Sequence, residues 1–528
     1  MIAQPLAAEL PEGEGPPAAD ARERLAAIDV GSNSVRLLVA EWDPAAGLQI
    51  VDEVKDQPRL AQGVATTGRL DDMAMARAME TLARMREVCR RRGVRRIAAV
   101  ATAAVRDAEN GEAFVRRVQD ELGIPLRIID AETEAVLSYR SVAHHFPLAG
   151  SRALVADIGG GSLELIGAVD GLVELTLSLP LGAVRLTELL LAGRGDPHRA
   201  VERLRTRARK ELKRSFRPRE WTAATIIGSG GTFTSLGRMA MARRGLPIPE
   251  AIHGTVVTTA EVETLLDWLT EMPPEQRRNV PGLNPQRADI ILAGLAVTAE
   301  LLALVDGRAV TVSAFGLREG LLLEMVGVAP TPVSDPLRLI REFVERCQSD
   351  RPHVEHVRTL ALQLFDQLAE PLGATAGERG VLEAAALLHD VGQLVSYRKH
   401  HKHSYQLIMH ADRLNLSARD RALVALVSRY HRRKGPSRKH PEFAILSDEE
   451  QAVVRRMSGL LRVADGLDRG HTSNVAGVKA AVTDGEVVLE VMPRAPNADL
   501  SLEIWGAGRK ADVLEKALER PVVIRAAS

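Results

Sequence analysis

Short apolar runs alternate with amphipathic segments through the first two thirds of the chain. The apolar runs predict buried strands at residues 25–30, 35–42, 97–101, 126–129, 153–158, 163–169, 225–227 and 309–312. Apolar positions that repeat at helical spacing predict helices over residues 72–92, 112–122, 132–144, 288–304 and 317–326. Because strands and helices alternate, this part of the chain is predicted to belong to the α/β class.

One short pattern occurs twice, each time where a predicted strand ends and another begins. Asp-x-Gly-x-x-Ser runs from Asp29 to Ser34 and again from Asp157 to Ser162. The match is short, but the flanking strands agree. We therefore expect two similar lobes that face each other.

The last third of the chain has a different pattern. Three prolines in residues 330–336 predict a linker. Helical periodicity follows as far as Gly470, with almost no strand signal. The remaining segments predict a small α/β appendage, with strands at residues 475–482, 487–492, 500–505 and 522–524 and a helix at 511–518.

These patterns predict five segments. They are a disordered leader, rich in proline and glycine, two α/β lobes, a helical domain and the appendage, at residues 1–22, 23–144, 145–328, 336–472 and 473–528.

Composition excludes several classes of protein. The 528 residues carry 69 basic and 69 acidic side chains, so a uniformly basic nucleic-acid-binding protein is not expected. Aromatic residues make up only 3%, which argues against stacking platforms for single strands. Two cysteines, Cys89 and Cys347, form no disulfide framework, and no run of about 18 apolar residues predicts a membrane span. We expect a cytoplasmic protein with no nucleic-acid or membrane partner.

Three glycine-rich loops are candidates for binding phosphate. Backbone N–H groups in such turns form anion-binding nests, and hydroxyl and amide side chains add donors. The candidate residues are Gly31, Ser32, Asn33, Ser34, Gly159, Gly160, Gly161, Ser162, Gly230, Gly231 and Thr232. One such loop alone is compatible with an ordinary β-turn, but the repeat and the third loop favour a site. The P-loop pattern and the Gly-x-Ser-x-Gly pattern are both missing from the sequence.

Carboxylates adjoin these loops. A carboxylate facing a phosphate repels it unless a cation lies between them, so Asp29 and Asp157 suggest Mg²⁺. Glu164 lies two residues beyond Ser162 on the return strand, hence on the same face. We expect Asp157 and Glu164 to share one Mg²⁺ ion.

Six segments resemble motifs of the exopolyphosphatase/guanosine pentaphosphate phosphohydrolase (Ppx/GppA) family, in family order. They are residues 27–34, 102–106, 129–135, 157–165, 228–232 and 316–320. The resemblance covers residues 24–326. It implies two ribonuclease-H-like lobes of the sugar kinase/Hsp70/actin superfamily around a cleft.

The resemblance also implies roles for individual residues. Glu134 matches the catalytic glutamate, which would orient and deprotonate the attacking water. Arg106 matches a phosphate-binding arginine, which would neutralise phosphoryl oxygens. The sequence departs from the family at Asp130-Ala131, at Thr133 and at Leu163. These changes bear on substrate preference more than on the reaction.

A second constellation lies in the predicted helical domain. His356, the adjacent pair His389-Asp390 and the distant Asp465 resemble the HD phosphohydrolase pattern, and long-form relatives of the Ppx/GppA family carry an HD-like domain in this place. Imidazole and carboxylate together suit Mn²⁺, Fe²⁺ or Zn²⁺. The resemblance implies a second divalent metal, and the alternative is a structural relic without metal.

The predicted function is Mg²⁺-dependent hydrolysis of terminal phosphate from inorganic polyphosphate. Basic runs at residues 203–219, 398–403 and 432–434 would form a track for a long polyanion. For residues 203–219 alone a solvated helix face is at least as good an explanation, whereas the histidine-lysine run at 398–403 favours the track. Alternatives are conversion of guanosine pentaphosphate to tetraphosphate, a non-catalytic alarmone-binding regulator, and a kinase-like activity. The family resemblance also implies a homodimer that forms through the helical half.

Overall fold

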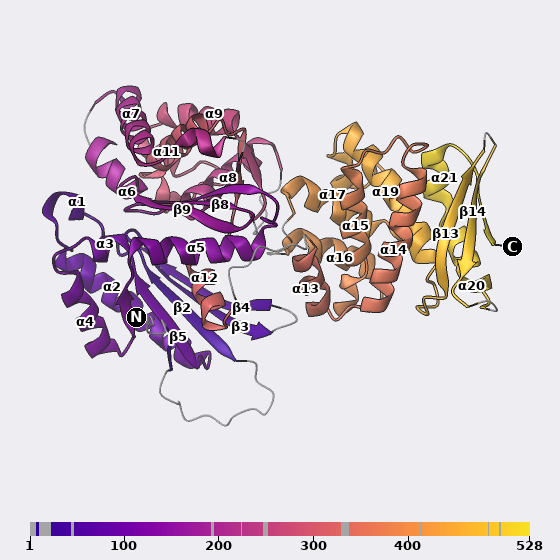
Figure 1. Cartoon of the computed structure of the whole chain (residues 1–528), viewed down its shortest axis with the longest axis horizontal. Helices are drawn as coiled ribbons and strands as arrows, with labels where there is room; N and C mark the ends of the chain where they lie inside the picture. Colours follow the sequence, from indigo (N-terminus) through magenta and orange to yellow (C-terminus); the bar gives the residue numbers. More distant parts are fainter. Residues whose placement is uncertain are drawn as a thin grey trace. The chain divides into compact units, whose positions relative to one another are not determined.

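The computed structural model divides the chain into two compact units, Met1–Pro336 and Leu337–Ser528. We call them the N-terminal and the C-terminal unit and describe each by itself (Figure 1). The described residues are 7–9, 23–43, 47–191, 195–222, 224–246, 252–328, 337–411, 414, 416–483, 485–495 and 498–527. The predicted linker at residues 330–336 lies outside them.

The first lobe of the N-terminal unit is built on a six-stranded sheet. The order is β1-β5-β2-β3-β4, and β6 also pairs with β5. The strands are β1 (Ala7–Glu9), β2 (Arg24–Val30), β3 (Val35–Asp43), β4 (Gly47–Asp56), β5 (Arg96–Ala101) and β6 (Leu126–Ile128). Strand β4 was not predicted because it is an edge strand with few fully buried side chains.

The predicted leader at residues 1–22 contains a strand, so the prediction of disorder is wrong for this part of it. Residues Ala7–Glu9 form β1, which pairs antiparallel with Arg96–Ala98 of β5. Strand β6 pairs only with Ala99–Ala101 on the same edge. Strand β1 therefore covers backbone groups that the short β6 leaves open.

The second lobe repeats the plan with a second six-stranded sheet. Its order is β11-β12-β10-β7-β8-β9. The strands are β7 (Arg152–Ile158), β8 (Leu163–Val169), β9 (Leu172–Leu179), β10 (Thr225–Ser229), β11 (Val256–Thr258) and β12 (Ala309–Val312). The predicted strands of this lobe are confirmed, and the edge strands β9 and β11 were missed.

Helices pack against both sheets of this unit (Figure 1). They are α1 (Val64–Thr67), α2 (Asp72–Arg91), α3 (Ala103–Arg106), α4 (Gly111–Leu122), α5 (Ala131–His145), α6 (Ala183–Leu186), α7 (Pro197–Ser215), α8 (Gly231–Arg243), α9 (Thr259–Thr270), α10 (Pro274–Arg277), α11 (Ile291–Leu304) and α12 (Leu317–Met325). Apolar residues of α2 and α4 share a core with the first sheet.

The two lobes exchange helices. Helix α5 precedes the second sheet in sequence and shares its core, where Tyr139 lies with Ile166. Helix α12 follows the second sheet but packs on the first, where Leu322 lies with Leu38. The boundary predicted between residues 144 and 145 therefore separates segments that the structure interleaves.

The exchanged helices meet at a glycine. A Cβ atom on Gly320 of α12 would lie 1.9 Å from the carbonyl oxygen of Leu137 in α5. Only glycine allows the backbones of α5 and α12 to approach this closely.

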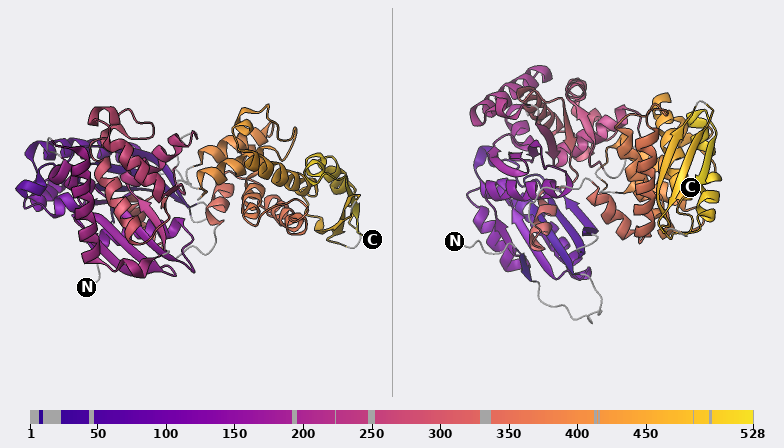
Figure 2. Two further views of the ribbon diagram at one scale, coloured as in Figure 1. Left: turned by 90° about the horizontal axis from the view of Figure 1, so that it is seen from above. Right: turned by 45° about the vertical axis from the view of Figure 1, so that its right-hand side comes forward.

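The C-terminal unit consists of helices and one three-stranded sheet, with α14 in contact with β13 (Figure 2). The helices are α13 (Arg338–Arg346), α14 (Arg351–Leu368), α15 (Glu378–Leu388), α16 (His400–His410), α17 (Ala418–Arg429), α18 (Pro441–Ala444), α19 (Asp448–Gly466), α20 (Ser501–Gly508) and α21 (Asp512–Leu518). The sheet has the order β13-β14-β15, with β13 (Val475–Val482), β14 (Val487–Pro493) and β15 (Val522–Ala526). One hydrophobic core joins the helices to the sheet, from Ile340 to Val522.

One prediction for this unit is wrong. Residues 500–505 were expected to form a strand, but Ser501–Gly508 is helix α20. Its apolar residues Leu502 and Trp505 are exposed, whereas Glu503 is buried. The hydrophobic pattern here does not follow burial, so it misled the prediction.

A helix that crosses a membrane must be both long and apolar. None of the helices in the described ranges is at once long enough and apolar enough to pass through a membrane.

Candidate functional site

A polar cleft lies where the loops of the two repeated patterns meet in the N-terminal unit. Its volume is about 930 Å³, including solvent at its open side. Residues from both lobes line it, namely Asp29, Gly31, Ser32, Asn33, Ser34, Arg36, Glu134, Ser138, Asp157, Gly159, Gly160, Gly161, Ser162, Glu164, Ser229, Gly230, Gly231, Arg287, Arg318 and Glu319. The structure thus brings together most of the residues that the sequence predicted.

The glycines of the second loop allow it to approach the first. A Cβ atom on Gly160 would lie 2.8 Å from Cβ of Ser32, and one on Gly161 would lie 2.9 Å from its hydroxyl oxygen. The third loop has a backbone requirement, because Gly230 has φ +90° and a Cβ there would lie 2.6 Å from Asp157 Oδ1. Glycine is therefore needed at these positions for the loops to converge.

The repeated pattern places two acidic residues in equivalent strand pairings. Asp29 pairs in register with Arg36, and Asp157 pairs in register with Glu164. Partners in register project from the same face of the sheet. Each lobe therefore places an aspartate at the same point of the repeated pattern. In the first lobe its neighbour across the strands is the basic Arg36, and in the second lobe it is the acidic Glu164.

The carboxyls of the cleft lack sufficient positive charge. Burial raises the pKa of Asp29 to about 6, although Arg36 opposes the shift. Burial also raises the pKa of Asp157, and it raises the pKa of Glu164 well above its usual range, with Glu134 adding to the effect. In addition, Asp29 Oδ1 is buried without a hydrogen-bond partner. A cation at these oxygens would remove the deficit.

Two arginines of the cleft, Arg36 and Arg287, show the opposite deficit: they lack neighbouring negative charge. Burial lowers the pKa of Arg287 to about 10, and the neighbouring Arg36 adds to the shift. Burial and the charge of Arg318 likewise lower the pKa of Arg36. These guanidinium groups would gain from an anion. The cleft therefore suits a ligand that brings both signs of charge, such as a phosphate with its metal ion.

Glu134 lies in the first turn of α5 and is only 9% exposed. Burial raises its pKa to about 7, against the hydrogen bond and charge of Arg106, while Asp29 and Asp157 add to the shift. The NH1 group of Arg106 donates to Glu134 Oε2 at 2.9 Å and lies 3.1 Å from the carbonyl oxygen of Ile129. Arg106 is thus paired with Glu134, and its predicted contact with phosphate stays a prediction.

The departures from the family pattern have structural causes. Asp130, in place of serine, is the N-cap of α5, and its side chain accepts from the Thr133 N–H at 2.7 Å. Aspartate caps helices as well as serine does. Leu163 is completely buried, so its side chain belongs to the core rather than to the cleft.

Thr232 does not act as predicted. Its side chain is completely buried, and its hydroxyl accepts from Arg287 NH2 at 3.3 Å. It therefore positions an arginine of the cleft. Sequence reasoning missed Arg36 and Arg287, although the pairing of Arg36 with Asp29 on the return strand was a signal that could have found Arg36.

The cleft can hold Mg²⁺ through a small number of carboxylates. Hydroxyls of Ser138 and Ser229 lie 3.3 and 3.1 Å from Asp157 Oδ2, which leaves Oδ1 as an oxygen donor. Glu164 Oε1 accepts from the Ser178 hydroxyl at 3.1 Å, which leaves Oε2 of that carboxylate. In the described ranges, compact groups of three or more ligand atoms occur in the C-terminal unit and not here. This arrangement fits Mg²⁺, which usually binds one or two carboxylates together with waters and substrate oxygens.

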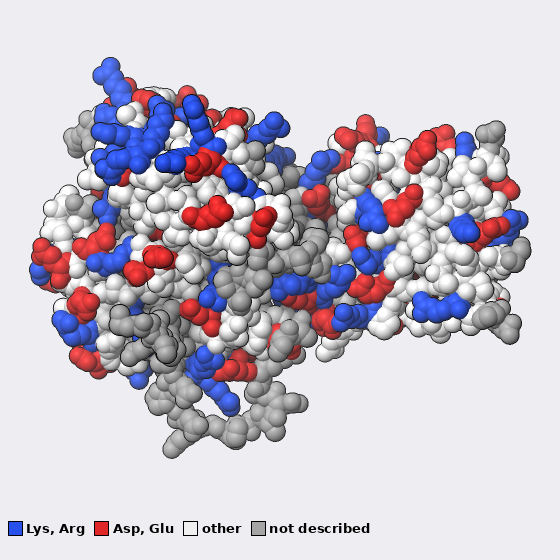
Figure 3. All heavy atoms as spheres, in the orientation of Figure 1, with Lys and Arg blue, Asp and Glu red and all other residues white. Residues whose placement is uncertain are grey.

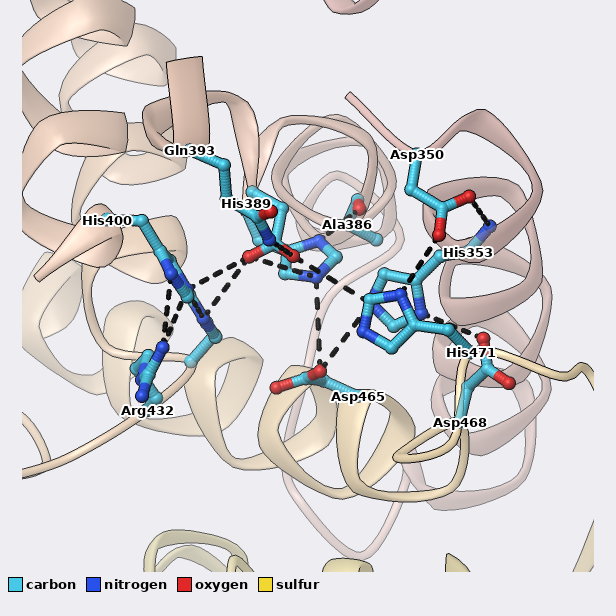
Figure 4. A network of polar contacts seen from close by, with 12 residues as sticks. Asp350, His353, Ala386, His389, Gln393, His400, Arg432, Asp465, Asp468 and His471 are labelled. Carbon is cyan, nitrogen blue, oxygen red and sulfur yellow. Dashed lines mark hydrogen bonds and ion pairs between the residues drawn. The ribbon is translucent and has the colours of Figure 1, made fainter. Parts of the chain in front are cut away.

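The second predicted site is a cluster of histidines and aspartates in the C-terminal unit (Figure 4). His389, Asp390 and Asp465 come together there, as predicted. The histidine from α14 is His353 and not His356, since His353 Nε2 lies 3.7 Å from Asp465 Oδ1. His356 is one turn further along the helix, and its ring belongs to neither group of ligand atoms found among the described residues.

The fold and the cleft together define a class of protein, the actin- and Hsp70-like α/β fold of sugar-kinase type. Residues 38–329, more than half of the chain, match the model of the Ppx/GppA phosphatase family, and residues 337–500 match the model of Ppx/GppA phosphatase, domain III. The chain belongs to the Ppx/GppA phosphatase family.

Individual relatives agree with this assignment. A guanosine-5'-triphosphate,3'-diphosphate pyrophosphatase of Pseudoalteromonas translucida is 29% identical over 415 residues, which are 77% of this chain and 80% of that protein. The crystal structure of the Aquifex aeolicus family member covers 58% of this chain and 97% of its own, with 32% identity and a TM-score of 0.50. The crystal structure of an exopolyphosphatase from Cytophaga hutchinsonii covers 58% of this chain and 99% of its own, with 27% identity and a TM-score of 0.53.

Proposed function

We propose that the cleft hydrolyses the terminal phosphoanhydride bond of inorganic polyphosphate in the presence of Mg²⁺ and releases orthophosphate. The observation that carries the proposal is the buried carboxyl of Glu134, in a cleft lined by glycine loops from both lobes. A general base works best when its pKa lies near the operating pH. The pKa of Glu134, about 7, meets this condition.

The residues of the chain divide the work of the reaction. Backbone N–H groups and hydroxyls of the loops at Ser32 and Ser162 bind oxygens of the terminal phosphate. Glu134 orients a water molecule in line with phosphorus and accepts its proton as the P–O bond to the penultimate phosphate breaks. The product phosphate carries the water oxygen, and the shortened chain leaves with the bridging oxygen. No covalent intermediate on the protein is required.

Two kinds of positive charge support this reaction. Mg²⁺ on Asp157 and Glu164 would neutralise phosphoryl oxygens. Arg36, Arg287 and Arg318 line the cleft and supply fixed charge. Arg106 keeps the Glu134 carboxylate in one orientation through its hydrogen bond.

A surface of the N-terminal unit is compatible with a polymeric substrate. Lys and Arg side chains gather over α7 (Figure 3). Part of this charge is already neutralised, because Arg205 pairs with Glu263 and Glu300, and Arg209 pairs with Glu300. The exposed bases on α7 also include Arg203, Lys210 and Lys213, which would attract a polyanion by long-range electrostatics.

A second candidate is hydrolysis of guanosine pentaphosphate at the same bond type. The relative named as a guanosine-5'-triphosphate,3'-diphosphate pyrophosphatase, which matches 77% of the chain, favours it. Both substrates end in a phosphoanhydride, so the loops would serve either one. Dimerisation through the C-terminal unit stays a prediction.

The experiment compares orthophosphate release from long-chain polyphosphate and from guanosine pentaphosphate, each with Mg²⁺. Wild type, Glu134→Gln and Glu132→Gln are assayed side by side, because Glu132 is an exposed carboxylate in the same helical turn. We expect Glu134→Gln to lose about 100- to 10,000-fold of the activity and Glu132→Gln to lose almost none.

The outcomes distinguish the candidates. Greater activity on guanosine pentaphosphate than on polyphosphate would make the nucleotide the substrate. Full activity in Glu134→Gln would overturn the mechanism. No activity on either substrate would favour a regulator that binds without hydrolysis.

A further inference from the structure

The histidine cluster of the C-terminal unit lies outside the cleft and carries chemistry that the proposed function does not use. Four imidazoles, two aspartates and one lysine converge there from α14, α16, α19, the ends of α15 and α17, and the segment after α20. All four histidines are at least 90% buried: His353, His389, His400 and His431.

The hydrogen bonds of these rings fix which nitrogen faces the centre. His353 Nδ1 lies 2.8 Å from Asp468 Oδ2, and Asp468 is itself held by the Ser473 N–H. The Nδ1 atoms of the other three lie 2.6 to 3.1 Å from backbone carbonyl oxygens. Since carbonyl and carboxylate oxygens accept, Nδ1 of His353, His389 and His431 carries a proton, and the Nε2 atoms of these rings face the centre. This is how proteins orient metal-binding histidines.

The Nε2 atoms of these rings surround the carboxylate of Asp390. Asp390 Oδ1 lies 3.8, 3.1 and 3.7 Å from Nε2 of His389, His400 and His431. Asp390 Oδ2 lies 4.0 Å from His353 Nε2. Asp390 is therefore shared by two groups of ligand atoms, each spanning less than 4.8 Å.

The first group contains His353, His389 and Asp390, and Asp465 lies beside it. Asp465 Oδ1 lies 3.7 Å from His353 Nε2 and 4.0 Å from His389 Nε2, and both nitrogens are buried without a hydrogen-bond partner. Ligands bound about 2.1 Å from one metal ion lie about 3 to 4.2 Å apart. Lys510 pairs with the other oxygen, Oδ2, so Oδ1 stays available.

The second group contains His400, His431 and Asp390. The Nε2 atoms of His400 and His431 lie 3.1 Å apart, close enough for one proton or one cation to be shared between them. Arg432 NH1 lies 3.1 Å from both nitrogens of the His400 ring. A cation between His400, His431 and Asp390 resolves the contact.

We propose that the C-terminal unit binds two divalent transition-metal ions bridged by Asp390. His353, His389 and Asp465 complete the first site, and His400 and His431 complete the second. Imidazole and carboxylate ligands suit Mn²⁺, Fe²⁺ or Zn²⁺ rather than Mg²⁺. The pair goes beyond the single-ion pattern that includes His356, and it is independent of the reaction in the cleft.

The test measures the metal content of the full chain. The protein is loaded with Mn²⁺ in excess Mg²⁺, desalted and analysed by mass spectrometry of its metals. We expect about two Mn²⁺ per chain in wild type, about one in the double variant His400→Gln/His431→Gln, and fewer than one in Asp390→Asn. His356→Gln, one turn from His353, is the matched control and keeps two.

Two further measurements locate the ions and show whether they are neighbours. The cleft variant Asp157→Asn should keep two ions, which assigns them to the C-terminal unit whether or not the cleft is active. Electron paramagnetic resonance should detect a spin-coupled Mn²⁺ pair in wild type and an isolated ion in the double variant. Circular dichroism and phosphate release verify that the variants fold.

The proposal fails if wild type retains one ion or none. It also fails if the double variant still retains two, or if the resonance shows only uncoupled ions. A single retained ion would indicate that a protonated histidine takes the place of the second metal.

Discussion

The cleft and the histidine cluster both bury several carboxylates, but they compensate for them differently. In the cleft, Asp29, Asp157 and Glu164 have raised pKa values because burial outweighs the nearby positive charge. In the cluster, Asp465 is paired with Lys510 and faces the imidazole rings of His353 and His389. The cleft therefore lacks charge until a ligand arrives, whereas the cluster has its donors already oriented.

This difference teaches what each site selects. Oxygen donors with few protein ligands bind a hard ion weakly and mainly together with substrate oxygens. Convergent imidazole nitrogens bind a softer ion regardless of substrate. We therefore expect metal at the cleft to exchange readily and metal at the cluster to stay bound.

Among the changes that test this comparison, the largest expected effect comes from removing a carboxylate of the cleft that is proposed to bind Mg²⁺. Asp157→Asn should reduce phosphate release by about 100- to 1,000-fold, because the amide cannot replace the charge of the carboxylate at the metal. Steady-state assays across a Mg²⁺ series measure it. Asp170→Asn, an exposed change in the turn after β8, is the control. Near-wild-type activity in Asp157→Asn would remove Asp157 from the metal site.

A smaller effect is expected when the partner of Glu134 is removed. Arg106 holds the pKa of Glu134 below the value that burial alone would give. In Arg106→Gln the pKa should rise, so the base is deprotonated only at higher pH. The acidic limb of kcat/KM should move up by about one pH unit, with about a five- to tenfold loss at pH 7. Arg117 forms an exposed ion pair with Glu121, so Arg117→Gln should change neither the pH profile nor the activity at pH 7. If the acidic limb of the Arg106→Gln profile does not move, a group other than Glu134 causes the pH dependence.

A few-fold effect is expected from one hydroxyl. Ser138 lies 3.3 Å from Asp157 Oδ2 and lowers the pKa of that carboxyl against the stronger effect of burial. Ser138→Ala should raise the pKa further and weaken the apparent Mg²⁺ affinity about threefold at pH 7. Ser141→Ala, a buried hydroxyl on the same helix, is the matched control. Equal effects in both variants would point to packing.

The smallest expected effect on phosphate release comes from removing metal from the histidine cluster, and it separates the cluster from the cleft most clearly. Phenanthroline, a nitrogen chelator, prefers transition metals to Mg²⁺. In excess Mg²⁺ it should strip the cluster and leave phosphate release within about twofold. Metal analysis and assay are made on the same sample. A loss of activity that parallels the loss of metal would show that the cluster supports the cleft.

Sequence reasoning was most successful where the local pattern determines the structure. The two Asp-x-Gly-x-x-Ser loops and Glu134 lie in the cleft as expected, because strand-loop-strand segments are local. It failed where the rotational position of a residue on its helix, or packing between distant segments, determines which side chains enter a site. His353 and His356 are one turn apart on α14, and spacing alone does not tell which faces the centre. Arg287 enters the cleft from a distant segment, which no local pattern reveals.

The exchange of α5 and α12 has a consequence for synthesis of the protein. Leu25 and Leu38 of the first sheet share a core with Leu322, which leaves the ribosome much later. At 5 to 20 residues per second the delay is roughly 15 to 60 s. During that interval one apolar face of a nascent sheet is uncovered, so we expect the first lobe to need protection by a chaperone before its last helix arrives.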